Sequence, residues 1–327
     1  MCIRDRNYNM PNEIYNSSLW GSPQEVGWGS IYYAFSKGGD TTSFITTWRT
    51  TSLNETITIP TGSGVYNYDI STSDGQNFTG VAGNQTITFG AAGDYDVSIS
   101  GTFPQIFFNN SGDKLKLIKV KQWGTIAWGS SQNKAFYGVS NCDWTATDFP
   151  NWSNVTRMSA TFRSSSFNGN LTNWDFSNVT RMDVAFFGSS SYTGVGLGSI
   201  DVGNVTNFSL AIRDTNVDQN LSSWDITSAT NFTSFAQNTT FSTSNYDAIL
   251  IGWEATLQAA FPNGSGYTPS ISINFGNSEY NGGGAAEAAR TSLINIFNWT
   301  ITDGLSLIHI SEPTRLLSIS YAVFCLK

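Results

Sequence analysis

The chain has 327 residues, of which 12% are charged and 14% aromatic, and its net charge at neutral pH is −8. This apolar and aromatic content argues against a disordered chain, and the acidic balance argues against a nucleic-acid partner, because little here would neutralise a phosphate backbone. Abundant Thr and aromatic residues with few Lys and Glu favour strands over long helices.

The two ends differ in composition from the rest. Residues 1–6 (MCIRDR) and 305–327 (LSLIHISEPTRLLSISYAVFCLK) look like translated sequencing-adapter read-through from metagenomic reads. We leave both out of fold reasoning and expect a signal peptide to be missing from this fragment. Residues 7–304 then hold no His and a single cysteine, Cys142. This excludes a Ser–His–Asp catalytic triad, a His-ligated zinc site and an internal disulfide. The apolar run near the C-terminus is shorter than the roughly 20 residues of a membrane span, so no span is expected.

Residues 7–40 fit no pattern, and we interpret them as the end of a truncated upstream domain. From 41 to 120, runs that alternate apolar and polar residues stand between Gly-containing turns, which predicts a small all-β sandwich of Ig/PKD-like type. These runs are FITTW, ETITIP, YNYDIS, QTITF and YDVSISG. The stretch TITFGAAGDYDVSISG resembles the closing hairpin of PKD-type domains, although STSDGQ replaces their W-G-D-G signature. Four Lys residues within 114–121 predict an edge strand protected by charge.

A repeated phrase dominates residues 121–243. PNWSNVTRM (150–158) is followed by WDFSNVTRM (174–182), IDVGNVTNF (200–208) and WDITSATNF (224–232), at spacings of 24, 26 and 24 residues. A phrase that recurs at such a period indicates an array in which each unit covers its apolar face with the next. The recurrent apolar positions include Trp174, Trp224, Val179, Val205, Met182, Phe186, Phe208 and Phe232.

The spacing within one unit suggests its local structure. Val179, Met182 and Phe186 stand at i, i+3 and i+7, as on one face of a helix, and NLTNWDF before them alternates like a strand. We therefore predict an α/β repeat solenoid of leucine-rich-repeat type, with short parallel strands and short helices. After 243 the phrase stops. Helical periodicity at 245–253 and 284–299 with strand-like SISINF and WTITDG predicts a C-terminal cap over 244–304.

The repeat NLTNWDFSNVTRMDVAFFGSSS, the stop NYDAILIGW and the closing GAAEAARTSLINIFNWTITDG resemble BspA-like leucine-rich-repeat surface proteins of bacteria. The resemblance covers roughly residues 41–304. It implies secretion and display at the cell surface, and a function in adhesion or protein binding with no enzymatic activity. The partner would be an extracellular protein, matrix or glycan whose identity the resemblance does not give.

Asp175, Asp201 and Asp225 recur in register, which suggests glycosidase chemistry or calcium binding. The simpler interpretation is a requirement of the coil, in which each carboxylate accepts backbone N–H groups at a turn. We therefore expect no catalytic residue, no metal site and no cofactor, and we take the recurrent positions as structural. Cys142 is expected to be a small buried hydrophobe.

Two functions stay open. The first is a non-enzymatic surface or secreted protein that mediates adhesion or protein interaction. The alternative is a carbohydrate-binding accessory module of a larger secreted enzyme, which would need an exposed aromatic strip. Trp123, Trp128, Trp174 and Trp224 are the candidates for that strip, but Trp at the repeat period is more typical of a core.

Overall fold

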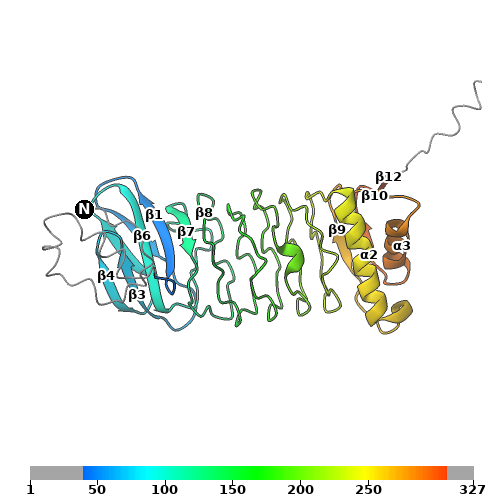
Figure 1. Cartoon of the computed structure of the whole chain (residues 1–327), viewed down its shortest axis with the longest axis horizontal. Helices are drawn as coiled ribbons and strands as arrows, with labels where there is room; N and C mark the ends of the chain where they lie inside the picture. The colour runs from blue at the N-terminus through cyan, green and yellow to red at the C-terminus, as the bar shows by residue number, and fades with distance from the viewer. Residues whose placement is uncertain (1–39, 308–327) are drawn as a thin grey trace, which may run out of the picture. The chain divides into compact units, whose positions relative to one another are not determined.

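The computed structural model describes residues 40–307. The described residues from Thr42 onward form one compact unit, in which a β-rich part, a run of coils and a helical part succeed one another along the chain (Figure 1). The predictions for 1–6, 7–39 and 308–327 concern residues outside the described range. The domain boundaries at 120/121 and 243/244 stay predictions.

Eight strands form the β-rich part and its junction with the coils. Six of them make one sheet in the order β4-β3-β6-β1-β7-β8, while β2 and β5 pair separately. The strands are β1 (Phe44–Thr50), β2 (Glu55–Ile59), β3 (Asn67–Thr72), β4 (Asn77–Val81), β5 (Gln85–Phe89), β6 (Gly93–Thr102), β7 (Leu117–Gln122) and β8 (Asp143–Trp144). The five runs expected from the sequence coincide with β1, β2, β3, β5 and β6. Strand β4 was missed because none of its side chains is fully buried, so it lacks the alternation that marks the others.

The six-stranded sheet is antiparallel except where β8 pairs with β7. β1 pairs antiparallel with both β6 and β7, and Phe44 lies opposite Ile99. β7 pairs on its other side with β8, in parallel, through Lys119 opposite Asp143. The Lys-rich strand is therefore not an edge strand, and that prediction is wrong. The side of β7 that faces away from β1 pairs with β8, a segment of the first coil, so the sheet continues into the coils.

The predicted fold class is also wrong, because the described residues form neither an α/β solenoid of strands and helices nor the Ig/PKD-like sandwich expected before it. Among the described residues between β8 and α2 (Thr243–Ala260), the 3₁₀ turn η2 (Leu197–Ser199) is the one helical segment, and the rest of the coils consists of turns and extended linkers. Isolated parallel β-bridges join successive coils. The described structure is thus mainly β-sheet and turn, with helix confined almost entirely to the C-terminal part. The bridged pairs are Ala127 with Asn151, Ser131 with Arg157, Arg157 with Arg181, Arg181 with Asn207, and Asn207 with Asn231.

Left-handed backbone explains why no helix forms. Val184 has a φ of 60°, and the equivalent residues Ala160, Leu210 and Ser234 have values of 54°, 56° and 53°. A second left-handed position follows four residues later in each coil, at Gly188 (φ 73°) after Val184. A right-handed helix cannot continue through a left-handed residue. The helical spacing of Val179, Met182 and Phe186 therefore reports which side chains are inside, and the backbone that carries them is a series of turns.

The backbone hydrogen bonds of these turns alternate between neighbours. The N–H groups of Val184 and Phe186 donate to the next coil, to Ser209 O and Ala211 O, both at 2.8 Å. The N–H of Ala185, between them, donates within its own coil to Met182 O at 3.2 Å. Alternate backbone N–H groups of this turn thus depend on a neighbouring coil, so a single unit could not satisfy its backbone hydrogen bonds alone.

Aromatic rings fill the interior of the stack. The rings of Phe136, Phe162 and Phe186 lie one above another, with centroids 5.6 and 5.7 Å apart and interplanar angles of 4° and 10°. In a neighbouring column Phe208 and Phe232, which take the position of Met182 in later coils, stack with centroids 4.8 Å apart and an interplanar angle of 5°. Equivalent side chains of successive coils therefore contact each other directly, which is the packing that the repeated phrase specifies.

The C-terminal part covers the last coil. It contains α2, η3 (Pro262–Gly264), β9 (Ser272–Asn274), β10 (Tyr280–Asn281), α3 (Ala285–Asn295), β11 (Thr300–Thr302) and β12 (Ser306–Leu307). Trp253 of α2 stacks on Trp224 of the last coil at 6.2 Å, and its Nε1 donates to Leu221 O at 2.8 Å. β9 pairs in parallel with β11, and β10 with β12. Strand β12 falls in the segment 305–327 that we take as read-through, and that origin stays a prediction.

Candidate functional site

The recurrent carboxylates lie exposed at the same place in successive coils. Oδ1 of Asp175, Asp201 and Asp225 accepts the backbone N–H two residues further on, in each case at 3.0 Å. Asp175 also accepts the hydroxyl of Ser177 at 2.6 Å, and Asn151 accepts that of Ser153 at 2.8 Å in the preceding coil. Each side chain thus stabilises a turn of its own coil.

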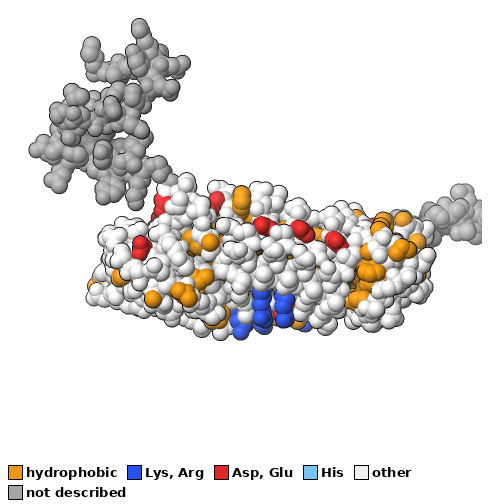
Figure 2. Space-filling view, turned by 90° about the horizontal axis from the view of Figure 1, so that it is seen from below, with side chains coloured by type: hydrophobic (Ala, Val, Ile, Leu, Met, Phe, Trp, Pro, Cys, Tyr) orange, Lys and Arg blue, Asp and Glu red, His pale blue; other side chains and the backbone are white. Residues whose placement is uncertain are grey.

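This arrangement does not support acid–base catalysis. A glycosidase needs two carboxyl groups whose surroundings separate their pKa values, so that one is protonated while the other is ionised. Asp175, Asp201 and Asp225 are all exposed, and each accepts the backbone N–H two residues further on, with an added hydroxyl at Asp175 and Asp225, so all three serve the turns of their own coils. The carboxylates form a row along the coils and do not line a cleft, and Figure 2 shows Asp and Glu side chains in such a row.

The recurrent apolar side chains all point inward. None is more than 6% exposed, and the Trp residues considered for a sugar-stacking strip are buried with them. Those Trp residues are therefore not available to a sugar. The buried positions are Trp174, Trp224, Val179, Val205, Met182, Phe186, Phe208 and Phe232, with Trp123 and Trp128 in the preceding segment.

Basic side chains gather on another side of the coils, which sequence reasoning missed. Figure 2 shows Lys and Arg in one block over the coils, apart from the row of carboxylates. We define a basic face by five residues whose contacts connect them across the coils. Arg157 and Arg181 are bridge partners. Arg163 and Arg213 both lie over the ring of Phe187. The backbone N–H of Lys134 donates to Ser159 O, two residues after Arg157, at 2.9 Å.

One row of the basic face places two arginines in direct register. Arg157 and Arg181 are bridge partners on adjacent coils. Nε of Arg181 contacts Asp183 Oδ1 at 3.0 Å, whereas Nε of Arg157 donates to the hydroxyl of Ser159 at 3.2 Å, which itself donates to Asp183. Asp183 therefore compensates Arg181, and among the described residues Arg157 has no ion pair.

The second row alternates arginines with aromatic rings. The guanidinium of Arg163 lies 4.8 Å from the ring centroid of Tyr137 and 5.0 Å from that of Phe187, and Arg213 lies 5.4 Å from Phe187 on the following coil. Arg213 also contacts Asp214 at 3.2 Å. Nε of Arg163 is buried and has no hydrogen-bond partner among the described residues. Rings on both sides hold the Arg163 guanidinium in place.

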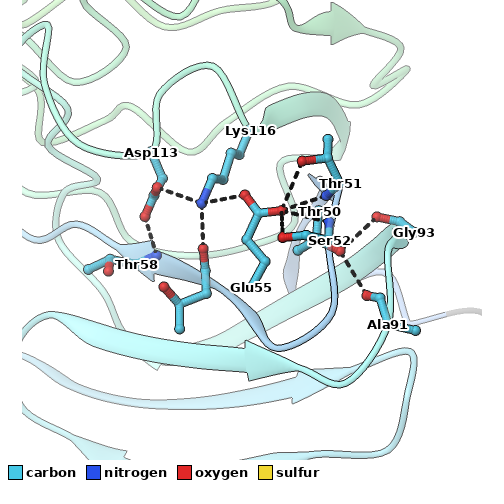
Figure 3. Close-up of polar contacts among 10 residues, drawn as sticks. Thr50, Thr51, Ser52, Glu55, Thr58, Ala91, Gly93, Asp113 and Lys116 are labelled. Atoms are coloured by element: carbon cyan, nitrogen blue, oxygen red, sulfur yellow. Dashed lines mark hydrogen bonds and ion pairs between the residues drawn. The ribbon is translucent and has the colours of Figure 1, made fainter.

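A hollow of about 600 Å³ on the β-rich part is a further candidate, because charged groups line it. Figure 3 shows Lys116 between two carboxylates. Its Nζ lies 3.0 Å from Glu55 Oε1 and 3.1 Å from Asp113 Oδ1. The backbone N–H of Thr51, together with Lys116, lowers the pKa of Glu55 from 4.5 to about 2. Glu55 is therefore ionised at neutral pH and cannot hold a transferable proton, so these charges stabilise the loops around them.

Other groups offer little chemistry. Burial raises the pKa of the Cys142 thiol, so the reactive thiolate is disfavoured. A hollow beside Trp123 and Trp174 has a volume of about 20 Å³, enough for one water. Within residues 40–307 no three His, Cys, Asp or Glu side chains cluster closely enough to hold a metal ion. None of the described helices is both long and apolar enough to cross a bilayer.

Comparison with known proteins gives a family match for the coils. Residues 130–248 match a family described as "Mycoplasma protein of unknown function, DUF285". The match spans the coils and the first turns of α2, and it is compatible with the resemblance to BspA-like surface proteins. No curated protein and no solved structure matches the chain significantly.

Proposed function

We propose that this chain is a non-enzymatic bacterial surface or secreted protein that binds an extracellular partner through the side chains that recur on the outside of its coils. The observation that carries the proposal is the contrast between the two sides of the repeat. Inward positions are filled by stacked rings, while outward positions present similar polar groups in register from coil to coil. Such a surface suits an extended partner that is contacted at several coils.

The geometry favours binding over catalysis. The carboxylates of the coils share one environment and hold turns, and those of the β-rich hollow are compensated by Lys116 and Arg49. The most deeply buried ionisable network lies in the C-terminal part, where Asp303 accepts the hydroxyl of Tyr246 at 2.6 Å and pairs with Arg290 at 2.8 Å, so its charges compensate each other. The family match to the coils supports a surface-associated repeat protein.

The alternative, an accessory module that binds sugars on an aromatic platform, is less favoured. It expects an exposed strip of rings, and Trp123, Trp128, Trp174 and Trp224 are at most 6% exposed. A glycan partner is still compatible with the proposal, provided that polar and charged side chains contact it.

A direct test uses the full chain on immobilised extracellular-matrix proteins and on a glycan array, with release of sugars or peptides measured in parallel. We expect retention of at least one partner without turnover. Asp175→Asn, Asp201→Asn and Asp225→Asn should each leave that retention within about threefold, because one turn among several coils is changed. Turnover that one of these substitutions abolishes, in a variant that still melts cooperatively, would refute the proposal.

A further inference from the structure

We propose that the basic face binds an anionic polysaccharide that carries carboxylate or sulfate groups along its length. This inference rests on the proposed function and names the surface and the chemistry of the partner.

The basic face is positive on a chain that is negative overall. Its five cations, Lys134 and four arginines, have two carboxylates among them, Asp183 and Asp214, which leaves a local charge of +3 on a chain of net charge −8. The coils thus separate charge, because Asp175, Asp201 and Asp225 lie in a different row. A local positive field on an acidic protein attracts anions to this one place.

The register of Arg157 and Arg181 favours an added anion. Parallel neighbours lie about 4.8 Å apart, and like charges in that relation destabilise a sheet. Asp183 relieves the repulsion on the side of Arg181, whereas Arg157 has no carboxylate among the described residues. A carboxylate or sulfate between the two guanidinium groups would accept hydrogen bonds from both planar forks. Binding would therefore remove a repulsion that the free protein retains.

The second row is organised before any ligand arrives. Tyr137 and Phe187 hold Arg163, and Phe187 also holds Arg213. Side chains fixed in this way lose less conformational entropy on binding than free arginines do. Arg163 and Arg213 are two coils apart, about 10 Å at the usual strand spacing, so they suit a polymer whose anionic groups recur along its length.

The surroundings favour a polysaccharide over a protein or a nucleic acid. Polar groups adjoin the arginines. Thr156 and Thr180 are exposed, and the half-buried Asn207 and Asn231 continue the row of Arg157 and Arg181. None of the large apolar side chains that are exposed in the described structure belongs to these rows, so the hydrophobic anchors of a protein interface are missing. Single-stranded nucleic acid stacks its bases on free aromatic faces, but two guanidinium groups already contact the ring of Phe187.

The test titrates the full chain with four polymers: polygalacturonate, dextran sulfate, uncharged dextran and a single-stranded thymidine oligonucleotide. We expect binding to polygalacturonate, dextran sulfate or both, with uncharged dextran inactive and affinity falling as salt is raised. The double variant Arg157→Gln with Arg181→Gln should lose about tenfold in affinity, equivalent to about 1.4 kcal/mol. Arg163→Lys, which keeps the charge and loses the fork, should bind more weakly than the wild type and more tightly than Arg163→Gln.

The matched control is Arg49→Gln with Lys121→Gln, which removes the same charge from exposed positions on β1 and β7. It should stay within about twofold of the wild type, since it lies outside the basic face. Equal losses in both double variants, no binding of either charged polysaccharide, or equally tight binding of the oligonucleotide would overturn the inference. If a partner from the array still depends on the coils but not on Arg157 and Arg181, the proposed function stands and this inference fails.

Discussion

At the scale of single residues, Val184 is the position where the coil backbone is most strained. It is β-branched and has a φ of 60°, a conformation that costs most non-glycine residues about 1–2 kcal/mol. Its equivalents Ala160, Leu210 and Ser234 adopt the same conformation. The strain persists because the N–H of Val184 donates to Ser209 O in the next coil, and a relaxed backbone would lose that bond.

We predict that Val184→Asn raises the free energy of unfolding by about 0.5–1 kcal/mol, because Asn tolerates left-handed backbone better than Val. The control is Val195→Asn, at an exposed position without positive φ, which should change stability by less than about 0.5 kcal/mol. Urea denaturation of the two variants measures the difference. Destabilisation by Val184→Asn beyond that of the control would mean that the half-buried side chain contributes more than the strain costs.

Met182 tests the inward register. Its side chain is fully buried, so Met182→Ala should lower the free energy of unfolding by about 2–5 kcal/mol. Asn173→Ala, at an exposed position of the same repeat, should change it by less than about 0.5 kcal/mol. Small and equal effects in urea denaturation would contradict the packing described for the coils.

At the scale of elements, the apolar pattern of the sequence predicts burial better than backbone. Val179, Met182 and Phe186 are all inside, as helical spacing suggested, yet they stand on turns. The residues that impose the left-handed conformation are Ala, Val, Leu and Ser, none of which signals it in a sequence. Most strands of the β-rich part were predictable because their alternation is a property of the strand itself. Strand β7 was expected at an edge because its cover, β8, comes from the first coil, whose position the strand pattern does not give.

The basic face could not be predicted for a related reason. Arg157 and Arg181 are 24 residues apart, and they become neighbours only when the coil period is converted into stacking. Aligning the copies brings them into one column, and Tyr137, Arg163, Phe187 and Arg213 into another. Only the apolar and Asp columns of that alignment entered the predictions. The signal was therefore present, in the charged columns of the same repeat.

The loop network around Glu55 predicts a pH dependence. Its folded-state pKa of about 2 lies below the ordinary value of 4.5, so its contribution is complete above pH 4.5 and is lost as pH falls toward 2. Glu55→Gln should therefore lower the melting temperature at pH 7, and the gap from the wild type should close between pH 4.5 and 2. A gap that is the same at pH 7 and pH 2.5 would show that hydrogen-bond geometry, and not ionisation, accounts for the effect.

At the scale of the whole molecule, the coils form an interior of stacked rings, closed by α2 at one end and continuous with the sheet through β8 at the other. The repeated phrase sets both the inward and the outward side chains of each coil. A partner that recognises one coil therefore finds a similar surface on the next. The central claim is that this repetition is the binding device. Removing whole coils without disturbing their register tests it most directly.

The decisive measurement is the affinity of the full chain, and of two deletion variants, for the partner retained on the array. Deletion of 155–178 joins Asn154 to Val179, and deletion of 205–228 joins Asn204 to Ala229, so each removes one 24-residue coil between equivalent positions. We expect each deletion to weaken binding by about three- to tenfold and both together to weaken it further, while cooperative melting persists. Unchanged affinity in the double deletion would contradict the account.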